Sequence, residues 1–388
     1  IPNMPENLEY IKLRGSYASV GTAFERYIAN PMYQWNASGL SWNTQTQYPM
    51  YDLKPELTNS FEVGLTVRFL KWFNLDATYY HTNTLNQTFN PQISTGSGSS
   101  EIYIQSGDVL NQGCEFTLGF NKDWNKFNWS STYTFSTNMN RIESLAENVL
   151  NAATGEYFSV DLLDMNGLGL AHFLLMEGGT LGDLYSLADY KYDSNGMIVV
   201  NEDGTITPQT ITDAKNYVKL GSVLPKANMS WRNDFRIGDF NFGFLITARL
   251  GGIVYSSTQA VLDYYGVSEA SAAARDAGGV FINGGDCIDA NKWFSSVGGS
   301  NPLPQEYTYS GTNVRLQEAS IGYTIPRSKL GDVCDLSLSL VGRNLLMIYN
   351  KAPFDPESIA TTGNYYQGID HFMMPSLRNF GFNVRVTF

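Results

Sequence analysis

Apolar and polar residues alternate along ten segments of the chain, which is the pattern of β-strands whose two faces meet different surroundings. Residues 379–388 show it most clearly, because every even position is apolar and every odd position is polar or glycine. The apolar positions of this strand are Phe380, Phe382, Val384, Val386 and Phe388. A strand that borders a protein core and a strand that borders lipid both alternate in this way. The pattern therefore predicts a strand and leaves both surroundings open.

The other nine segments have the same period of two. Their apolar positions are, in chain order, Ile11, Leu13 and Tyr17; Phe61, Val63, Leu65, Val67 and Phe69; Phe73, Leu75, Ala77 and Tyr79; Cys114, Phe116, Leu118 and Phe120; Phe127, Trp129, Tyr133 and Phe135; Ala227, Met229, Trp231 and Phe235; Phe240, Phe242, Phe244, Ile246, Ala248 and Leu250; Ala319, Ile321, Tyr323 and Ile325; and Leu336, Leu338 and Leu340.

Charged residues in these segments fall on the opposite parity. They are Lys12, Arg14, Glu62, Arg68, Asp76, Glu115, Arg232, Asp234, Arg249, Arg343 and Arg385. An arginine on a lipid-facing surface near the bilayer centre costs about 2–4 kcal/mol, so charge confined to one face favours a barrel with a watery interior. Asn233 is a polar exception on the apolar parity, and the pattern slips near Glu318, where we expect a bulge or a strand end above the membrane.

The connections between the segments alternate between short and long. The short ones are residues 70–72, 121–125, 238–239 and 326–335, and the long ones are about 21–56, 86–106, 142–223, 252–311 and 346–376. Short turns at one end and long loops at the other are typical of outer-membrane barrels. We therefore expect an all-β, antiparallel transmembrane β-barrel in which residues 1–388 belong to one barrel domain, the five long connections are extracellular and the C-terminus is periplasmic.

Two pieces of local structure are expected inside the long connections. The turn signals DSNG (193–196) and NEDG (201–204) flank Val199 and Val200 and predict a small hairpin. Their spacing lacks the closing glutamate of a calcium-binding EF-hand, so we interpret them as turns. The alanine-rich segment 268–276 predicts a short helix.

Composition narrows the class of protein. The 24 Tyr, 22 Phe, 7 Trp and 36 Gly favour β-structure, and no apolar run is long enough for a spanning helix. The net charge of -12 excludes a basic footprint for nucleic acid. Three widely spaced cysteines, Cys114, Cys287 and Cys334, fit neither a disulfide framework nor a zinc site. Nothing at Ile1 resembles a signal peptide, so the protein is either intracellular or a mature or cut piece of something longer.

No arrangement of catalytic residues is evident. His81, His172 and His371 are far apart, and there is no nucleophile elbow, HExxH motif or Walker loop. We expect no enzymatic activity, no cofactor and no metal ion. Aromatic side chains in the long connections are candidates for substrate binding, because flat rings stack on sugar faces or peptide side chains. They are Trp35, Trp42, Tyr48, Tyr51, Tyr255, Tyr264, Tyr265, Trp293, Tyr365 and Tyr366. The alternative is that these rings pack the loops together or form an interfacial aromatic girdle.

Several motifs resemble those of the SusC/RagA-like TonB-dependent outer-membrane transporters. They are KLRGSYASVG (12–21), YDLKPELTNSFEVGL (51–65), TYYHTNTLNQ (78–87), SGDVLNQGCEFTLGF (106–120), LPKANMSWRNDF (224–235), ARDAGGVFINGG (274–285), VRLQEASIGYTIP (314–326), VGRNLLMIY (341–349) and DPES (355–358). The resemblance spans essentially the whole chain in the family's order. It implies that the ten strands complete a barrel of about 22 strands, whose plug and N-terminal domains are absent from this chain.

The resemblance also implies a function. It is TonB-dependent import of nutrient oligomers across the bacterial outer membrane, with glycans favoured as cargo and oligopeptides second. The implied partners are a SusD-like surface lipoprotein as a lid, the N-terminal plug-bearing part of the same transporter, the TonB complex through that part, outer-membrane lipid and lipopolysaccharide, and the oligosaccharide or oligopeptide substrate. The apolar strand 380–388 is expected to be the assembly signal. Two alternatives are a passive outer-membrane pore or adhesin barrel, and a soluble carbohydrate-binding β-sandwich.

Overall fold

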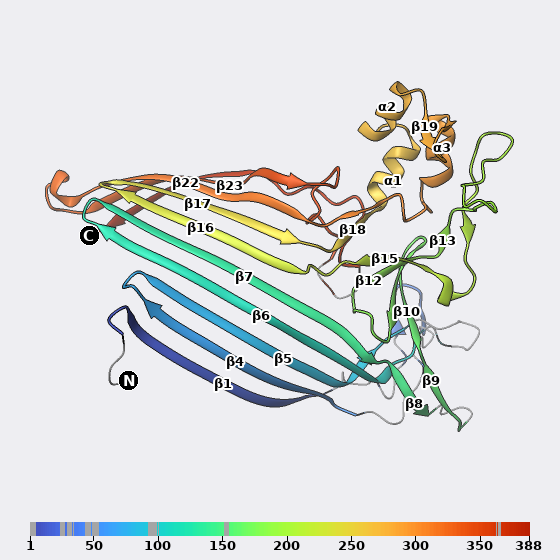
Figure 1. Cartoon of the computed structure of the whole chain (residues 1–388), viewed down its shortest axis with the longest axis horizontal. Coiled ribbons are helices and arrows are strands. Elements are labelled where there is room, and N and C mark those ends of the chain that lie inside the picture. Colours follow the sequence, from blue (N-terminus) through green and yellow to red (C-terminus); the bar gives the residue numbers. More distant parts are fainter. Residues whose placement is uncertain are drawn as a thin grey trace.

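The computed structural model describes residues 5–23, 28, 33, 35–42, 48, 54–91, 99, 101–150, 155–361, 363 and 366–388. Ten long antiparallel strands form one sheet (Figure 1), and each strand pairs with the next of these strands along the chain. They are β1 (Leu8–Thr22), β4 (Glu56–Phe69), β5 (Phe73–Phe89), β6 (Ile104–Trp124), β7 (Phe127–Ser144), β16 (Ala227–Ile237), β17 (Phe240–Leu250), β22 (Asn313–Ile325), β23 (Asp335–Asn350) and β25 (Asn379–Thr387). Each contains one of the ten alternating segments, so the all-β antiparallel prediction is confirmed.

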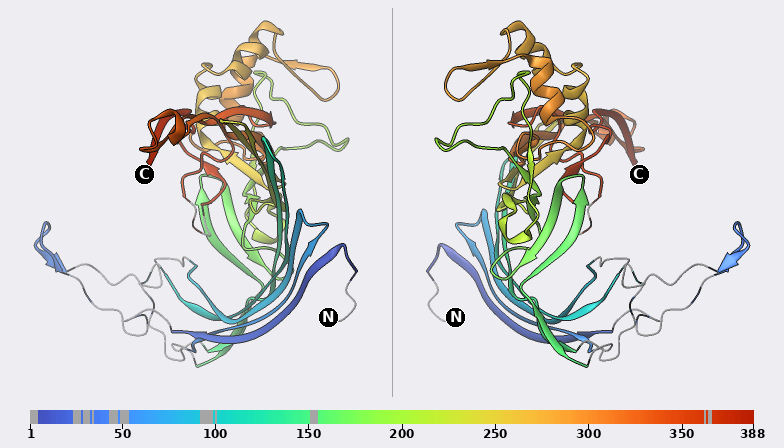
Figure 2. Two further views of the ribbon diagram at one scale, coloured as in Figure 1. Left: turned by 90° about the vertical axis from the view of Figure 1, so that its left-hand side faces the viewer. Right: turned by 90° about the vertical axis from the view of Figure 1, so that its right-hand side faces the viewer.

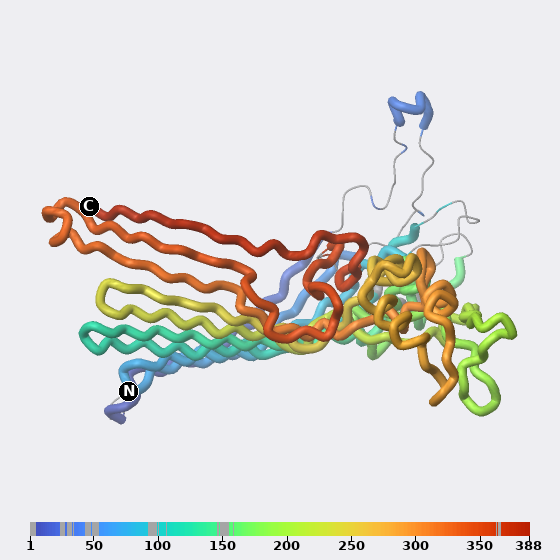
Figure 3. Tube along the Cα trace, turned by 90° about the horizontal axis from the view of Figure 1, so that it is seen from above, coloured from blue at the N-terminus to red at the C-terminus, as the bar shows by residue number. Residues whose placement is uncertain are grey.

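The sheet bends into an open trough (Figure 2). Its tight turns lie at one end, and its long connections lie at the other (Figure 3). The first strand begins and the last strand ends at the tight-turn end, where Leu8 pairs with Phe69 and Asp335 pairs with Thr387. Because all ten strands share one sheet, the alternative of a soluble sandwich, which needs two packed sheets, is wrong.

One predicted connection is shorter than expected. Residues 121–125 do not form a loop, because β6 continues to Trp124 and pairs there with Phe127. Asn125 adopts φ 66°, a left-handed conformation that asparagine tolerates and that a two-residue hairpin turn requires. The rings of Trp124 and Phe127 stack with centroids 5.4 Å apart, so the strands remain in contact up to the turn.

The apolar parity forms one continuous face of the sheet. Its large side chains are exposed on strands at both edges and in the middle, as Leu13, Phe242 and Phe382 show. An apolar surface of this extent is typical of a membrane-facing or partner-facing surface. At the tight-turn end it finishes in aromatic pairs, with Phe69 stacked on Phe73 and Phe240 tilted against Tyr323, as in the aromatic girdle of a barrel.

Both irregularities expected on this face are present. The register shifts between Leu245 and Ile246 and between Leu316 and Glu318, which confirms a bulge near Glu318. Asn233 is only 1% exposed, and its Oδ1 accepts a 3.0 Å hydrogen bond from Trp129 Nε1. The neighbouring rings therefore separate this amide from the surroundings of the apolar face.

The long connections contain further short elements. They are β2 (Trp35–Asn36), β3 (Ser41–Trp42), β8 (Ala146–Leu150), β9 (Tyr157–Val160), β10 (Leu162–Leu168), β11 (Ala171–Met176), β12 (Asp183–Ser186), β13 (Ala188–Asp189), β14 (Gln209–Thr210), β15 (Val218–Ser222), β18 (Ile253–Ser256), β19 (Val280–Ile282), β20 (Asp286–Ile288), β21 (Thr308–Ser310), β24 (Ile369–Asp370), α1 (Ser257–Tyr264), α2 (Glu269–Asp276), α3 (Ala290–Val297) and the 3-10 turn Ala214–Asn216; another 3-10 turn, Arg327–Lys329, lies at the tight-turn end.

The predicted helix at 268–276 is confirmed as α2, with Ser268 Oγ accepting a hydrogen bond from the Ser271 N–H at its start. The two predicted turns are also confirmed, but each closes separately. Tyr192 bridges to Ile198 and Val200 bridges to Ile206, so two successive turns replace the single hairpin expected around Val199. Among the described residues, no helix combines the length and the hydropathy needed to span a membrane.

We call the described residues of the connections 145–226, 251–312 and 351–378 the loop cap. Its three connections share one buried core, to which Phe173, Tyr255, Trp293 and Ile369 all contribute. Fully burying such side chains stabilises a fold by about 1.5–3 kcal/mol each. The cap, which includes α1–α3, is therefore a packed body at one end of the sheet (Figure 1).

The two faces of the sheet should respond differently to charge. Phe244→Arg places a guanidinium on the apolar face and should cost about 2–4 kcal/mol in the membrane, enough to abolish insertion of the chain into outer membranes. The control is Ser320→Arg, because Ser320 pairs with Gly243 and lies at nearly the same depth on the polar face. Membrane fractionation checks both variants, and normal insertion of Phe244→Arg would contradict the face assignment.

Candidate functional site

The polar parity of the sheet lines a hollow of about 570 Å³ between β7, β16, β17, β22 and β23. Its floor is made of small residues, and its rim is charged. The small residues are Gly243, Ser320, Gly322, Ser337 and Ser339. A Cβ atom on Gly243 would lie 2.7 Å from Asp234 Oδ1 and 3.1 Å from Ser320 Oγ, so a larger residue would crowd the floor. The hollow therefore lies mainly on the polar parity of the sheet.

Four charged side chains from three strands form a network at this hollow. Arg232 Nε lies 2.8 Å from Asp234 Oδ2, and Arg343 Nε lies 3.0 Å from Glu318 Oε2. Arg232 also approaches Glu318, at 3.6 Å. Each acid faces a guanidinium, so the network offers donors and acceptors of both signs to a polar chain in the trough.

A second network lies on the polar face of the first strands. The two terminal nitrogens of Arg14 donate to the two carboxylate oxygens of Asp76, at 2.9 and 2.7 Å. Thr66 Oγ1 donates to the same carboxylate at 2.6 Å, and a Cβ atom on Gly64 would lie 2.4 Å from Arg14 Nε. The guanidinium therefore lies flat over the glycine, held by a bidentate pair.

The predicted aromatic residues that the structure describes are not brought together into one site. Trp35 and Trp42 pair across the short hairpin β2–β3, edge to face at 5.3 Å, and are 51% and 64% exposed. Tyr264 and Tyr265, at the end of α1, are exposed and meet edge to face at 5.2 Å. Both pairs present rings to the surroundings, as stacking on a ligand requires.

The other candidates are placed differently. Tyr366 is exposed, and its ring meets the ring of Phe173 edge to face, with the two ring centroids 6.5 Å apart. Tyr48 is half-buried, and its backbone N–H donates to Glu101 O at 2.8 Å. Tyr51 and Tyr365 lie outside the described residues.

Two candidates are core residues of the cap. Tyr255 is 0% exposed and Trp293 is 6% exposed. Trp293 stacks on Tyr190 at 6.2 Å, and the Tyr190 hydroxyl donates to Glu306 at 2.5 Å. Their rings have no surface left for cargo, so we do not retain these two as binding residues.

The charged networks were only partly predictable. Parity identified Arg14, Asp76, Arg232, Asp234 and Arg343 as residues of the polar face. Parity carries no information on which acid meets which base, because partners such as Arg14 and Asp76 are 62 residues apart. Within the described part of the chain, no group of three or more His, Cys, Asp or Glu side chains could hold a metal ion.

The cap contains a buried carboxylate. Asp263 is buried, and its Oδ1 accepts hydrogen bonds from Gln259 Nε2, at 2.7 Å, and from Ser268 Oγ. Burial raises the pKa of Asp263, and the two hydrogen bonds offset only part of this effect. Burial likewise raises the pKa of Tyr190, Tyr255 and Tyr307, so these phenols are neutral at physiological pH.

This raised pKa predicts a pH dependence of cap stability. The unfolded chain ionises Asp263 near pH ~3.9, before the folded chain does, so stability falls as pH rises through the folded pKa and stays lower above it. Asp263→Asn should therefore raise the thermal midpoint of the cap at pH 7, and the gain should vanish below about pH 4.

Tryptophan fluorescence during heating measures the midpoint, since Trp293 lies in the cap core. The control is Asp276→Asn, at an exposed position in α2. A lower midpoint for Asp263→Asn at pH 7, or a difference that is the same at pH 4, would contradict the role of burial.

Comparison with known proteins identifies the family to which the chain belongs. A family model described as "TonB dependent receptor-like, beta-barrel" matches residues 7–223, which is more than half of the chain. Two similar proteins from Formosa agariphila, TonB-dependent receptors P3 and P26, are each 24% identical to this chain, over alignments of 373 and 413 positions that cover 88% and 99% of it. The chain spans only 35% and 40% of the length of these relatives.

Solved structures show the same fold. The RagAB peptide importer in its "closed-closed" state matches 99% of this chain with a TM-score of 0.72 at 15% identity. This chain covers 42% of that structure's chain, so the trough corresponds to part of a larger barrel. With the family match, the antiparallel sheet and its two chemically distinct faces, the chain belongs to the TonB-dependent receptor-like β-barrel family.

Proposed function

We propose that this chain forms part of the wall, and the extracellular loops, of an importer that takes nutrient oligomers across the bacterial outer membrane, driven through TonB. The observation that carries the proposal is the ten-stranded sheet, apolar on one face and charged on the other, with its long connections at one end. Members of this family are outer-membrane barrels. A wide polar interior is what passage of a large, hydrated nutrient requires.

The same sheet supports a proposed orientation in the membrane. The tight turns and the C-terminus face the periplasm, and the five long connections face the cell exterior, since outer-membrane barrels carry their long loops outside. Residues 1–388 belong to one barrel domain. The plug and the residues that couple to TonB lie in an N-terminal part outside this sequence.

Glycans are the favoured cargo. The exposed ring pairs Trp35–Trp42 and Tyr264–Tyr265 offer flat surfaces to sugar faces, and Tyr366 is a further candidate. Tyr48, Tyr51 and Tyr365 remain predicted candidates. Oligopeptides are the second candidate, favoured by the hollow in the trough, where Arg232, Asp234 and Glu318 present both signs of charge. A peptide carries charged ends and side chains that such a network can pair.

A SusD-like surface lipoprotein is the proposed lid over the loop cap. Trapping cargo between lid and barrel accounts for the length of the connections. The TonB complex would act through the plug-bearing part, and outer-membrane lipid and lipopolysaccharide would cover the apolar face. The apolar residues of the C-terminal segment, Phe380, Phe382, Val384, Val386 and Phe388, are the proposed assembly signal. No cofactor and no covalent step enter this function, because the work is a ligand-gated conformational change.

Uptake of labelled oligosaccharide and labelled oligopeptide by energised cells tests the proposal. Uptake should stop when the proton-motive force is collapsed. Tyr264→Ala with Tyr265→Ala should lower glycan uptake at limiting concentration by about 2–10-fold, the equivalent of a lost aromatic contact of about 0.5–1.5 kcal/mol. The matched control is Tyr157→Ala, an exposed tyrosine of β9 outside the candidate set.

Three results would decide against parts of the proposal. Uptake that persists without the proton-motive force would favour a passive pore. Loss of glycan uptake in the Tyr157→Ala control would remove the specific role of the α1 tyrosines. Peptide uptake that depends on Arg232, without glycan uptake, would make oligopeptides the cargo.

A further inference from the structure

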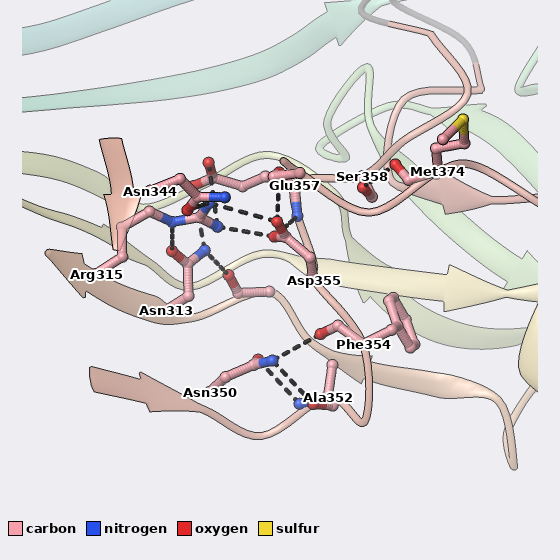
Figure 4. A network of polar contacts seen from close by, with 12 residues as sticks. Asn313, Arg315, Asn344, Asn350, Ala352, Phe354, Asp355, Glu357, Ser358 and Met374 are labelled. Carbon is pink, nitrogen blue, oxygen red and sulfur yellow. Dashed lines mark hydrogen bonds and ion pairs between the residues drawn. The ribbon is translucent and has the colours of Figure 1, made fainter. Parts of the chain in front are cut away.

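The last long connection is attached to the rest of the molecule at two places. We call its described residues, 351–361, 363 and 366–378, the strap. The base of the strap consists of residues 354–357 and Ser376, and it contacts Arg315 of β22 and Asn350 of β23. Farther along the strap, β24 pairs with β18, and Phe372 contacts α1. Figure 4 shows the contacts at the base.

An arginine forms the base contact. Arg315 of β22 is 3% exposed, and its NH2 lies 2.8 Å from Asp355 Oδ1 and 3.3 Å from Glu357 Oε2. Both acids belong to the strap. A guanidinium buried to this extent must be paired, because an uncompensated buried charge is strongly destabilising.

Other polar groups complete this contact. Arg315 Nε donates to Asn313 Oδ1 at 3.3 Å, and Asn313 Nδ2 donates to Glu357 Oε1 at 3.2 Å. Ser376 Oγ, at the other end of the strap, donates to Asp355 Oδ2 at 2.5 Å. Asp355 therefore ties both ends of the strap to one arginine of the wall. The pKa of Asp355 is lowered: burial raises it, but the hydrogen bonds from Arg315 and Ser376 outweigh that effect.

β24 of the strap is joined to the cap core. It pairs with β18 in parallel, with Tyr255 opposite Ile369 and Ser256 opposite Asp370. Ser256 Oγ donates to Asp370 Oδ2 at 2.6 Å, and both residues are buried. Directly after β24, the Phe372 N–H donates to Thr258 Oγ1 of α1 at 2.6 Å. The strap thus connects the start of α1 with the top of β22.

We propose that Arg315 is a positioning residue, whose ion pair with Asp355 couples the loop cap to the barrel wall through the strap. When the pair is intact, the cap and the wall move as one body. When the pair is broken, the strap base separates from β22 while the core of the cap stays packed. The coupling does not depend on which cargo is carried. It therefore goes beyond the proposed function, and it can be tested independently of that function.

Hydrogen exchange of the purified protein in detergent tests the local part of the proposal. Arg315→Met keeps most of the side-chain volume and removes the charge, so amides of the strap base should exchange at least about tenfold faster, since one buried partner is left unpaired. The reporting amides are those of Glu357, bonded to Asp355 Oδ1, and Ser358, bonded to Asp355 O. Amides of α3 and of the paired strands β16 and β17 should not change.

The matched control is Arg343→Met. Arg343 also pairs with an acid across β22 and β23, namely Glu318, but it is largely exposed, so its loss should leave strap exchange unchanged. Unchanged strap exchange in Arg315→Met, or equal acceleration throughout the chain, would overturn the proposal. If Arg315→Met does not fold, Ser376→Ala removes one bond to Asp355 without exposing a charge, and it should give a smaller acceleration confined to the same amides.

A distance measurement tests the coupling itself. Spin labels at Ser295 in α3 and at Lys126 in a tight turn, with the native cysteines replaced by serine, report the position of the cap relative to the wall. The distance distribution should broaden in Arg315→Met and stay narrow in Arg343→Met. Arg315→Lys should restore a narrow distribution, because it restores the charge. Identical distributions in the wild type and Arg315→Met would show that other contacts hold the cap in place.

Discussion

Backbone hydrogen bonding inside an apolar layer is the constraint on which this structure depends. In lipid, an unpaired N–H or C=O group costs several kcal/mol, so a spanning strand must pair along both of its edges. Eight of the ten strands do so within this sheet, whereas β1 and β25 each have one neighbour in the part of the chain that the structure describes. Among the described residues the outer edges of β1 and β25 have no strand partner, and in a membrane each edge would need one. This agrees with the 42% of a solved barrel chain that this chain covers.

The pairing of the backbone also decides to which side of the sheet each side chain points. Once strands pair in register, successive residues must face opposite sides, so one face can be apolar while the other holds the networks around Arg14 and Arg232. Outside the membrane this constraint ends, because water can satisfy the backbone. There the chain builds a second core instead, to which Tyr255 and Ile369 contribute from different connections. The molecule thus combines a barrel wall, stabilised by backbone pairing, with a cap, stabilised by side-chain burial.

Much of the wall could be predicted from the sequence, and little of the cap could. The period of two located all ten strands and the bulge near Glu318. This was possible because the two faces of such a strand meet different surroundings, so apolar and polar residues alternate in the sequence itself. It misjudged residues 121–125, since a strand that leaves the lipid no longer needs to alternate and β6 continues to Trp124. The burial of Trp293 and Tyr255 depends on contacts between distant connections, which local patterns do not contain. For the same reason DPES could be recognised as a motif, whereas the partner of Asp355, 40 residues away in β22, could not.

We propose that this chain is one part of a larger importer. Native mass measurement of the particle extracted from outer membranes in mild detergent, with peptide mapping of its components, tests it most directly. The chain should be found together with a plug-bearing N-terminal portion, which would supply strand partners for β1 and β25, and with a surface lipoprotein, which would form the lid over the cap. A stable particle that contains this chain alone, as a closed species, would contradict the account and make a passive pore or adhesin the better explanation.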